Sequence, residues 1–302
     1  MLMKRIKRKN SGESESLLYY SMLLPFSLLF FLFTVLPVAS SIVLSFTDFD
    51  MVSVPKFNGV ANYARMFLND QIFPITVKNT LFFAVVTGPL GFLLSFVLAW
   101  FINEFKPIVR TVLSFLFYAP ALVGNAYFVW QIAFSSDSYG YINSILLSSG
   151  LITEPITWLK SEAYVMPIII IVQLWQSMGV SFLANISGLQ NVNNEMYEAG
   201  AIDGIRNRWQ ELWYITLPAM QHILLFSAVM QIASSFSVSA IAIQLAGYPS
   251  VGYAVDTIVS YLTDVGTVKY EMGYAAALSV VLFLMMAATR WVIGKIISSI
   301  GR

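Results

Sequence analysis

The chain has 302 residues, of which 58% are hydrophobic and only 11% are charged, and its formal net charge is +1. A soluble domain carries about 25% charged residues, so this composition predicts a polytopic membrane protein and gives no indication of nucleic-acid binding. The absence of cysteine excludes disulfides, thiol catalysis and Cys-based metal sites. The single histidine, His222, leaves no cluster for zinc or haem, so we expect the chain to bind no metal or cofactor of its own.

Six segments are long and apolar enough to cross a membrane, because a helix needs about 20 mostly apolar residues to span the hydrocarbon core. They are residues 17–46, 79–102, 108–134, 164–188, 219–246 and 273–297. The first is overlong and contains Pro25 and Pro37, which predicts a kink or an interfacial start. Its apolar stretch is too long for a cleaved signal peptide. We predict an all-α fold with one membrane domain over residues 17–302 and a basic leader at 1–16.

The Lys and Arg residues predict the orientation of these spans, since they are enriched on the cytoplasmic side. With a cytoplasmic N-terminus, the inside holds Lys4, Arg5, Lys7, Arg8, Lys9, Lys106, Arg110, Arg206, Arg208, Arg290, Lys295 and Arg302. The outside holds Lys56, Arg65, Lys78, Lys160 and Lys269. Both termini and the loop at residues 191–218 are therefore expected in the cytoplasm, where the basic leader can also touch anionic lipid.

The 191–218 loop is polar and helix-competent, and from Glu198 it reads EAGAIDGIRNRWQELWYITLP. Asn193 and Asn194 can cap a helix whose first turn holds Glu195 and Glu198, where carboxylates are favourable against the helix dipole. An ordered, charged loop of this length between two membrane spans predicts a docking site for another protein.

Small residues and a turn follow the first helix of this loop. Ala199, Gly200 and Ala201 are expected to present a nearly side-chain-free face, which lets another surface approach closely. Asp203 and Gly204 form a turn dipeptide, in which glycine can take a positive φ.

An aromatic segment completes the loop. A second short helix should place Trp209, Leu212 and Trp213 on one face that packs under the membrane helices. Pro218 suits the first turn of the next span. An amphipathic hairpin that merely rests on lipid is the alternative interpretation. It explains the tryptophans but neither the small-residue face nor the turn.

The order of these features resembles the cytoplasmic coupling loop that the ATPases of binding-protein-dependent ABC importers grip. Further segments carry the resemblance along nearly the whole chain. They are Phe57–Tyr63, Lys78–Thr80, Gly140–Asn143, Gly150–Leu159, Gly188–Asn191 and Met196–Glu198. The pattern is similar to the sugar-type permeases, and to the larger of the two permease subunits of the maltose importer. Gly200 and Ile205 depart from the alanines that the family usually has, and the stretch from Gly204 to Pro218 is one residue longer than the commonest spacing.

This resemblance implies the type I ABC importer permease fold, in a bacterial plasma membrane. The implied partners are a second permease subunit, two ATPase subunits, an external solute-binding protein and a carbohydrate, with oligosaccharide the expected class. The chain has no P-loop pattern, so ATP and magnesium would bind to the ATPases, and this chain would be a transporter subunit rather than an enzyme. The contacts implied with the ATPases are at Glu198, Ala199, Gly200, Asp203, Gly204, Leu217 and Pro218.

Uncharged polar side chains gather in the fourth and fifth predicted spans. Polar groups inside a bilayer usually face a cavity or another helix. The resemblance places the family's sugar contacts on or near Gln173, Ser177, Gln231, Ser234 and Ser235. Amides and hydroxyls suit sugar hydroxyls, and Trp175 or Phe236 could stack on a pyranose ring. Hydrogen bonding between the helices is the alternative role for these residues.

Other signals are weaker. His222 is expected to be a snorkelling or loop-packing residue near the cytoplasmic interface. Asp256, Asp264 and Glu271 flank a predicted external loop, where contact with a binding protein is favoured over hydrolysis. Different solutes, such as a polyol phosphate, remain an alternative cargo, although the spans lack buried basic residues. A self-sufficient secondary transporter would instead need an ionisable residue and broken helices in mid-span, and an intramembrane enzyme would need a catalytic dyad.

Overall fold

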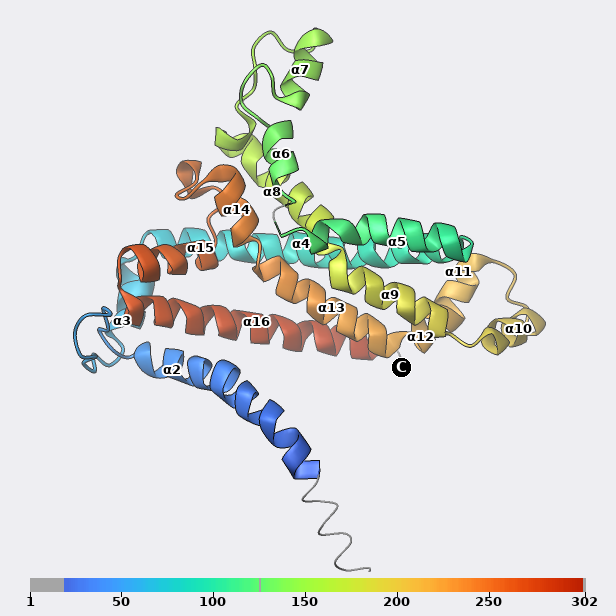
Figure 1. Cartoon of the computed structure of the whole chain (residues 1–302), viewed down its shortest axis with the longest axis horizontal. Coiled ribbons are helices and arrows are strands. Elements are labelled where there is room, and N and C mark those ends of the chain that lie inside the picture. Colours follow the sequence, from blue (N-terminus) through green and yellow to red (C-terminus); the bar gives the residue numbers. More distant parts are fainter. Residues whose placement is uncertain (1–18, 125, 301–302) are drawn as a thin grey trace, which may run out of the picture. The chain divides into compact units, whose positions relative to one another are not determined.

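The computed structural model describes residues 19–124 and 126–300, with side chains described to residue 295. The basic leader at 1–16 lies outside these residues. The chain divides into two compact units. Figure 1 shows the whole chain coloured from the N-terminus to the C-terminus. One unit combines the chain up to Arg65 with Val265–Val280, and the other combines Met66–Asp264 with the chain from Val281 onward.

The described secondary structure is helical apart from one isolated bridge between Thr47 and Phe57. The helices are η1 (Phe31–Val35), α2 (Leu36–Leu44), α3 (Ala61–Ala64), η2 (Arg65–Asn69), α4 (Ile72–Asn103), α5 (Pro107–Leu122), α6 (Phe128–Ala133), α7 (Tyr141–Ser148), η3 (Trp158–Lys160), α8 (Glu162–Ser177), α9 (Gly179–Asn191), α10 (Asn194–Ile202), α11 (Arg208–Glu211), η4 (Leu212–Thr216), α12 (Leu217–Ala219), α13 (Gln221–Phe236), α14 (Ser239–Ala246), η5 (Val251–Tyr253), α15 (Ile258–Thr263), η6 (Asp264–Val268) and α16 (Met272–Ile300). The all-α prediction is therefore confirmed.

In the first unit, the helix at Tyr19–Leu44 is apolar along its length, and none of its most apolar stretch is buried. The π-helical turn η1 lies just before Pro37, where the missing N–H interrupts the regular hydrogen-bond ladder. Asn62 closes the turn after this helix, because its side-chain amide donates to the carbonyl oxygens of Ser45 (2.9 Å) and Thr47 (2.8 Å).

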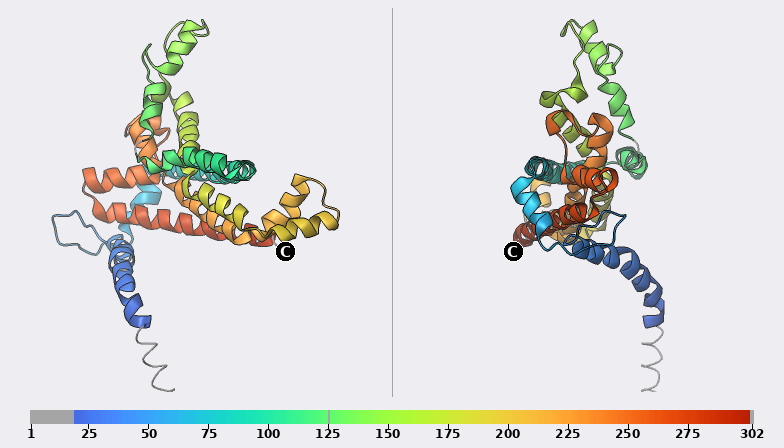
Figure 2. Two further views of the ribbon diagram at one scale, coloured as in Figure 1. Left: turned by 45° about the vertical axis from the view of Figure 1, so that its right-hand side comes forward. Right: turned by 90° about the vertical axis from the view of Figure 1, so that its left-hand side faces the viewer.

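In the second unit, α4 is the central helix and packs against α9 and α13. One face of α4 carries small buried residues at helical spacing, namely Gly88, Gly91, Ser95 and Ala99. Small side chains let neighbouring helix backbones approach closely, which is the usual device of helix contacts in membranes. Figures 1 and 2 show that the segment α10–α12 and the segment α6–α7 extend from different sides of these packed helices.

The predicted spans are only partly matched. Four described helices are long and apolar enough to cross a membrane, or five if α8 and α9 form one span. The third predicted span, 108–134, is not one helix, because α5 ends at Leu122 and α6 begins at Phe128. Pro120 removes a backbone donor near this end, and Gly124 adds flexibility. At 16 residues, α5 is about 24 Å long and shorter than a core of about 30 Å.

The fourth predicted span, 164–188, is also not straight. It bends by 44° where α8 meets α9, at Met178. A Cβ on Gly179 would lie 2.6 Å from the Cβ of Ala121, so only glycine permits this approach to α5. Gly179 is the sign of this bend in the sequence, and the prediction of one continuous span did not use it.

The three carboxylates that were expected in one solvated loop lie in different surroundings. Asp256 is buried at 1% exposure, and desolvation raises the pKa of its carboxyl above the usual value, with the Ser250 backbone N–H at 3.1 Å opposing this shift. Asp264 lies in the helical turn η6, and Glu271 forms an ion pair with Arg65 at 2.7 Å. The expectation of solvation is therefore wrong for Asp256, whereas Asp264 and Glu271 are partly exposed.

Candidate functional site

The predicted polar residues meet between α8 and α13 in the second unit. The Gln173 amide donates to the carbonyl oxygen of Ser234 (2.9 Å) and to its hydroxyl (3.2 Å). One turn further along α8, the Ser177 hydroxyl accepts from the Gln231 amide at 2.8 Å. Four of the five predicted residues therefore form two pairs that cross the helix interface, which is the interhelical role considered for them.

A cavity of about 280 Å³ opens beside these pairs. It is lined by Ala121, Gly124, Tyr127, Gln173, Gln176, Ser177, Ser234, Ser237, Ala240 and Ile241. Gln173, Ser177 and Ser234 thus have both a packing role and a place on a cavity wall. The Oε1 atom of Gln176 is buried and accepts no hydrogen bond from any described residue. A buried acceptor without a partner is costly, so this wall is suited to a ligand that brings a hydroxyl donor.

Gln231 and Ser235 face α4 instead of the cavity. A Cβ on Gly91 would overlap the Gln231 amide nitrogen and lie 2.7 Å from its Cδ, and a Cβ on Gly88 would lie 3.7 Å from the Ser235 hydroxyl. The Ser235 hydroxyl donates to the carbonyl oxygen of Ile232 at 2.8 Å. These two residues therefore pack against the glycines of α4 and are not part of the cavity lining.

The aromatic residue on the cavity wall is Tyr127, not Trp175 or Phe236. Trp175 packs edge-on against Trp130 with ring centroids 5.6 Å apart, and Phe236 is buried at 2% exposure. The sequence interpretation missed Tyr127 and Ser237. Tyr127 lies in the break between α5 and α6, and the assumption of a continuous third span hid the one signal, Gly124, that marks this break.

The first helix of the 191–218 loop forms as the sequence predicts. In α10, the Asn193 side chain caps the N-terminus by accepting from the Glu195 N–H at 3.1 Å. Asp203 ends the helix, and Gly204 takes a φ of 95°, in the left-handed region that favours glycine. Glu198 and Ala199 are exposed on this helix, and Pro218 is exposed in α12.

Gly200 does not lie on an open face with Ala199 and Ala201. It is buried, and a Cβ at this position would lie 2.6 Å from the Cδ1 of Ile215 and 3.1 Å from that of Ile205. Consecutive residues of an α-helix are rotated by about 100°, so three in a row cannot share one face. The expected small-residue surface is therefore wrong for Gly200, whose small size serves packing within this chain.

The aromatic segment matches the prediction only in part, since the Trp209 ring contacts Trp100 of α4 and Leu212 joins a buried cluster with α4 residues. Trp209 and Trp213 are 64% and 61% exposed, whereas Leu212 is buried. The buried side of η4 consists of Leu212, Ile215 and Thr216. Thr216 forms a hydrogen bond with the Tyr197 hydroxyl at 3.0 Å, which joins η4 to α10.

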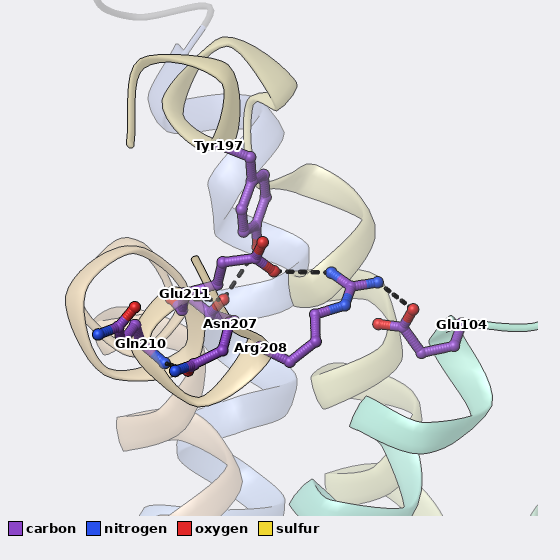
Figure 3. A network of polar contacts seen from close by, with 7 residues as sticks. Glu104, Tyr197, Asn207, Arg208, Gln210 and Glu211 are labelled. Carbon is purple, nitrogen blue, oxygen red and sulfur yellow. Dashed lines mark hydrogen bonds and ion pairs between the residues drawn. The ribbon is translucent and has the colours of Figure 1, made fainter. Parts of the chain in front are cut away.

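An ion-pair network joins the loop to the end of α4 (Figure 3). Arg208 donates to Glu211 at 2.8 Å and pairs with Glu104, which caps α4. The hydrogen bond with Glu211 is the main cause of a raised Arg208 pKa. The sequence interpretation missed this network, because it used Arg208 only as a sign of orientation and did not consider Glu104.

Comparisons with known proteins identify the family to which this chain belongs. Residues 88–300 match the family described as binding-protein-dependent transport system inner membrane component. The probable ABC transporter permease protein YesP of Bacillus subtilis (strain 168) is 30% identical over 299 residues, which cover 96% of this chain and 93% of the relative. The arabinooligosaccharides transport system permease protein AraP of the same organism is 30% identical over 264 residues, covering 87% and 82%.

Two further similarities extend this result. The lactose transport system permease protein LacF of Rhizobium radiobacter is 32% identical over 202 residues, covering 65% of each chain. The fold is similar to a chain in the crystal structure of a bacterial ABC transporter involved in the import of the acidic polysaccharide alginate. That likeness has a TM-score of 0.79 and 23% identity, and covers 98% of this chain and 100% of that one.

Proposed function

Because the chain belongs to the family of binding-protein-dependent transport system inner membrane components, we propose that it is one permease subunit of an ATP-driven importer of neutral oligosaccharides. Relatives named for arabinooligosaccharides and lactose support a sugar as the cargo. A second permease completes the path, an external binding protein delivers the sugar, and two ATPases engage the 191–218 loop. Both termini and this loop are then cytoplasmic, in keeping with the distribution of Lys and Arg.

The observation that carries the proposal is the uncharged polar wall of the cavity between α8 and α13. Among the residues that the structure describes, the lining contains amides, hydroxyls and the Tyr127 ring but no Asp, Glu, Lys or Arg. Such groups exchange hydrogen bonds with sugar hydroxyls and offer no counter-charge to an anion. At about 280 Å³ the cavity lies just below the range of about 300–1,000 Å³ typical of small-molecule sites. This size fits a half-site that a second permease completes.

Transport then follows alternating access. Closure of the ATPases moves α10, whose exposed Glu198 and Ala199 provide the contact surface. The loop passes this movement to the packed helices, and the cavity opens to the opposite side. Leu217 and Pro218 connect the loop to α13, so they take part in the same movement.

Reconstitution tests this proposal. The chain is purified with a second permease and ATPase subunits, placed in proteoliposomes and supplied with binding protein and a labelled arabino-oligosaccharide or lactose. We expect uptake that requires ATP and the ATPase subunits. The bend between α8 and α9 also occurs in secondary transporters. Uptake driven by an ion gradient without ATPases would therefore support that class and contradict the importer.

Replacing Gln173 with leucine is expected to lower sugar uptake about tenfold, as loss of one good hydrogen bond of about 1.4 kcal/mol allows. The amide lies on the cavity wall and also orients Ser234. Membrane levels should stay normal, because interhelical hydrogen bonds average about 0.6 kcal/mol. The control is Gln244→Leu, an exposed position on α14. Equal uptake by both variants would show that Gln173 serves only the packing of α8 against α13.

Replacing Glu198 with lysine is expected to prevent retention of the ATPase during purification and to abolish uptake. Glu198 is exposed on α10, and a reversed charge at a desolvated interface costs several kcal/mol. The matched control is Glu154→Lys, the same charge change at an exposed position beyond α7. Pull-down of the ATPase measures the effect. Normal retention of the ATPase by the Glu198→Lys variant would show that Glu198 does not lie in the ATPase interface. It would favour the alternative that the loop is an amphipathic hairpin on the lipid surface.

A further inference from the structure

The 191–218 loop is fixed to α4 as well as to α13, although only α13 follows it in the chain. Arg208 pairs with Glu104, which lies 104 residues earlier in the sequence. Next to this pair, the rings of Trp209 and Trp100 lie against each other with centroids 5.3 Å apart. Charged and aromatic contacts therefore join the same two segments side by side.

The local structure of the loop presents Arg208 for this contact. The Asn207 side chain caps α11 by accepting from the Gln210 N–H at 2.9 Å. The Gln210 side chain accepts from the Arg206 N–H, also at 2.9 Å. Arg208 is thus the first residue of a capped helix, and Glu211, three positions later, forms an ion pair with its guanidinium, as Figure 3 shows.

The loop and α4 also contribute residues to one buried apolar cluster. Leu212 belongs to the same buried cluster as Ala99 and Ile102 of α4. The loop and the last turns of α4 therefore share one apolar cluster as well as the ion pair. Because the guanidinium and the Glu104 carboxylate are 58% and 42% exposed, the pair contributes little to the stability of the fold.

We infer that Arg208 is a positioning residue that clamps the 191–218 loop to α4, so that loop and helix move together during the transport cycle. This inference rests on the proposed function. It gives the loop a second route to the polar residues, because α4 carries the two glycines against which Gln231 and Ser235 pack. A loop attached through α13 alone would pull on one side of the cavity only.

The first test compares Arg208→Gln with Arg206→Gln. Both arginines are exposed and differ by two positions, but the two ion pairs with Glu104 and Glu211 belong to Arg208. We expect Arg208→Gln to lower the sugar imported per ATP hydrolysed by roughly two- to fivefold, the range that loss of an exposed ion-pair network allows. Thermal stability and ATPase retention should match Arg206→Gln. An unchanged ratio of sugar to ATP in Arg208→Gln would overturn the clamp.

The second test uses the absence of cysteine from this chain. Glu104→Cys and Arg208→Cys are combined in a complex whose other subunits also lack cysteine. Before cross-linking, this variant should be uncoupled like Arg208→Gln. A short bifunctional thiol reagent should then restore the ratio of sugar to ATP towards wild type. An unrestored ratio of sugar to ATP would show that the contact between residues 104 and 208 does not couple the loop to α4. A block of transport on cross-linking would show that this contact must open during the cycle. Either result would overturn the inference. If the wild-type complex itself imports no sugar, the proposed function fails instead.

Discussion

Replacing Gly91 with alanine is expected to lower sugar uptake at least about tenfold, whereas Gly88→Ala should remain near wild type. The two glycines are one turn apart on α4 and face the same helix. An alanine methyl group at position 91 would overlap the Gln231 amide and lie 3.2 Å from the Ser177 hydroxyl. At position 88 the methyl group would make an ordinary contact, 3.7 Å from Ser235. Overpacking typically costs about 1–3 kcal/mol, enough for this difference.

The measurement is uptake in proteoliposomes, normalised to the amount of assembled complex. Gly91→Ala should also break the hydrogen bond between Gln231 and Ser177, because the amide must move to admit the methyl group. Gln231→Ala removes the obstructing side chain, so the double variant Gly91→Ala with Gln231→Ala should be no worse than Gln231→Ala alone. Additive losses in the double variant would show that Gly91 acts through another contact.

Gly200→Trp and Ala199→Trp are expected to abolish uptake for different reasons. Gly200 is buried against Ile215, so an indole there separates α10 from η4 and destabilises the loop within this chain. Ala199 is exposed on α10, so the same side chain leaves the loop folded and obstructs only the proposed ATPase contact. Neither variant changes a membrane span, and both should insert with normal topology.

Limited proteolysis of the purified chain distinguishes the two variants before any ATPase is added. Cleavage within the 191–218 loop should increase for Gly200→Trp and stay at the wild-type level for Ala199→Trp. ATPase retention should fall in both. If Ala199→Trp retains the ATPase and transports normally, the exposed face of α10 is not the contact surface. If Gly200→Trp resists proteolysis, the contact with Ile215 does not hold the loop together.

Local chemistry made the two ends of α10 predictable. The Asn193 cap and the turn at Gly204 depend on residues within three or four positions of each other, and both are present in the structure. Hydrogen bonding between α8 and α13 could also be predicted, because glutamine and serine side chains in a membrane helix need hydrogen-bond partners. Which residues then face the cavity depends on the rotation of α13 against α4, and the sequence pattern does not contain that rotation.

Features that depend on distant contacts were missed. At the bend at Met178, Gly179 approaches Ala121, 58 positions earlier, and the sequence near the bend does not contain this contact. The break after Leu122 was missed although Gly124 marks it, because the residues on both sides fitted one continuous span. Gly200 was placed on the wrong side of α10 because its packing partner, Ile215, lies 15 positions later, beyond the turn at Gly204.

The bend between α8 and α9 also has a consequence for biosynthesis. At 16 and 13 residues, the two helices measure about 24 and 20 Å, so neither alone can cross a core of about 30 Å. They must enter the bilayer together, carrying Gln173, Ser181 and Asn185 into it. The partner of Asn185, Ser95 on α4, has already been synthesised. Gln173 and Ser181 instead form hydrogen bonds with α13, which is synthesised later. A nascent chain that ends before α13 should therefore integrate this segment poorly, and stable integration should wait until α13 emerges from the ribosome.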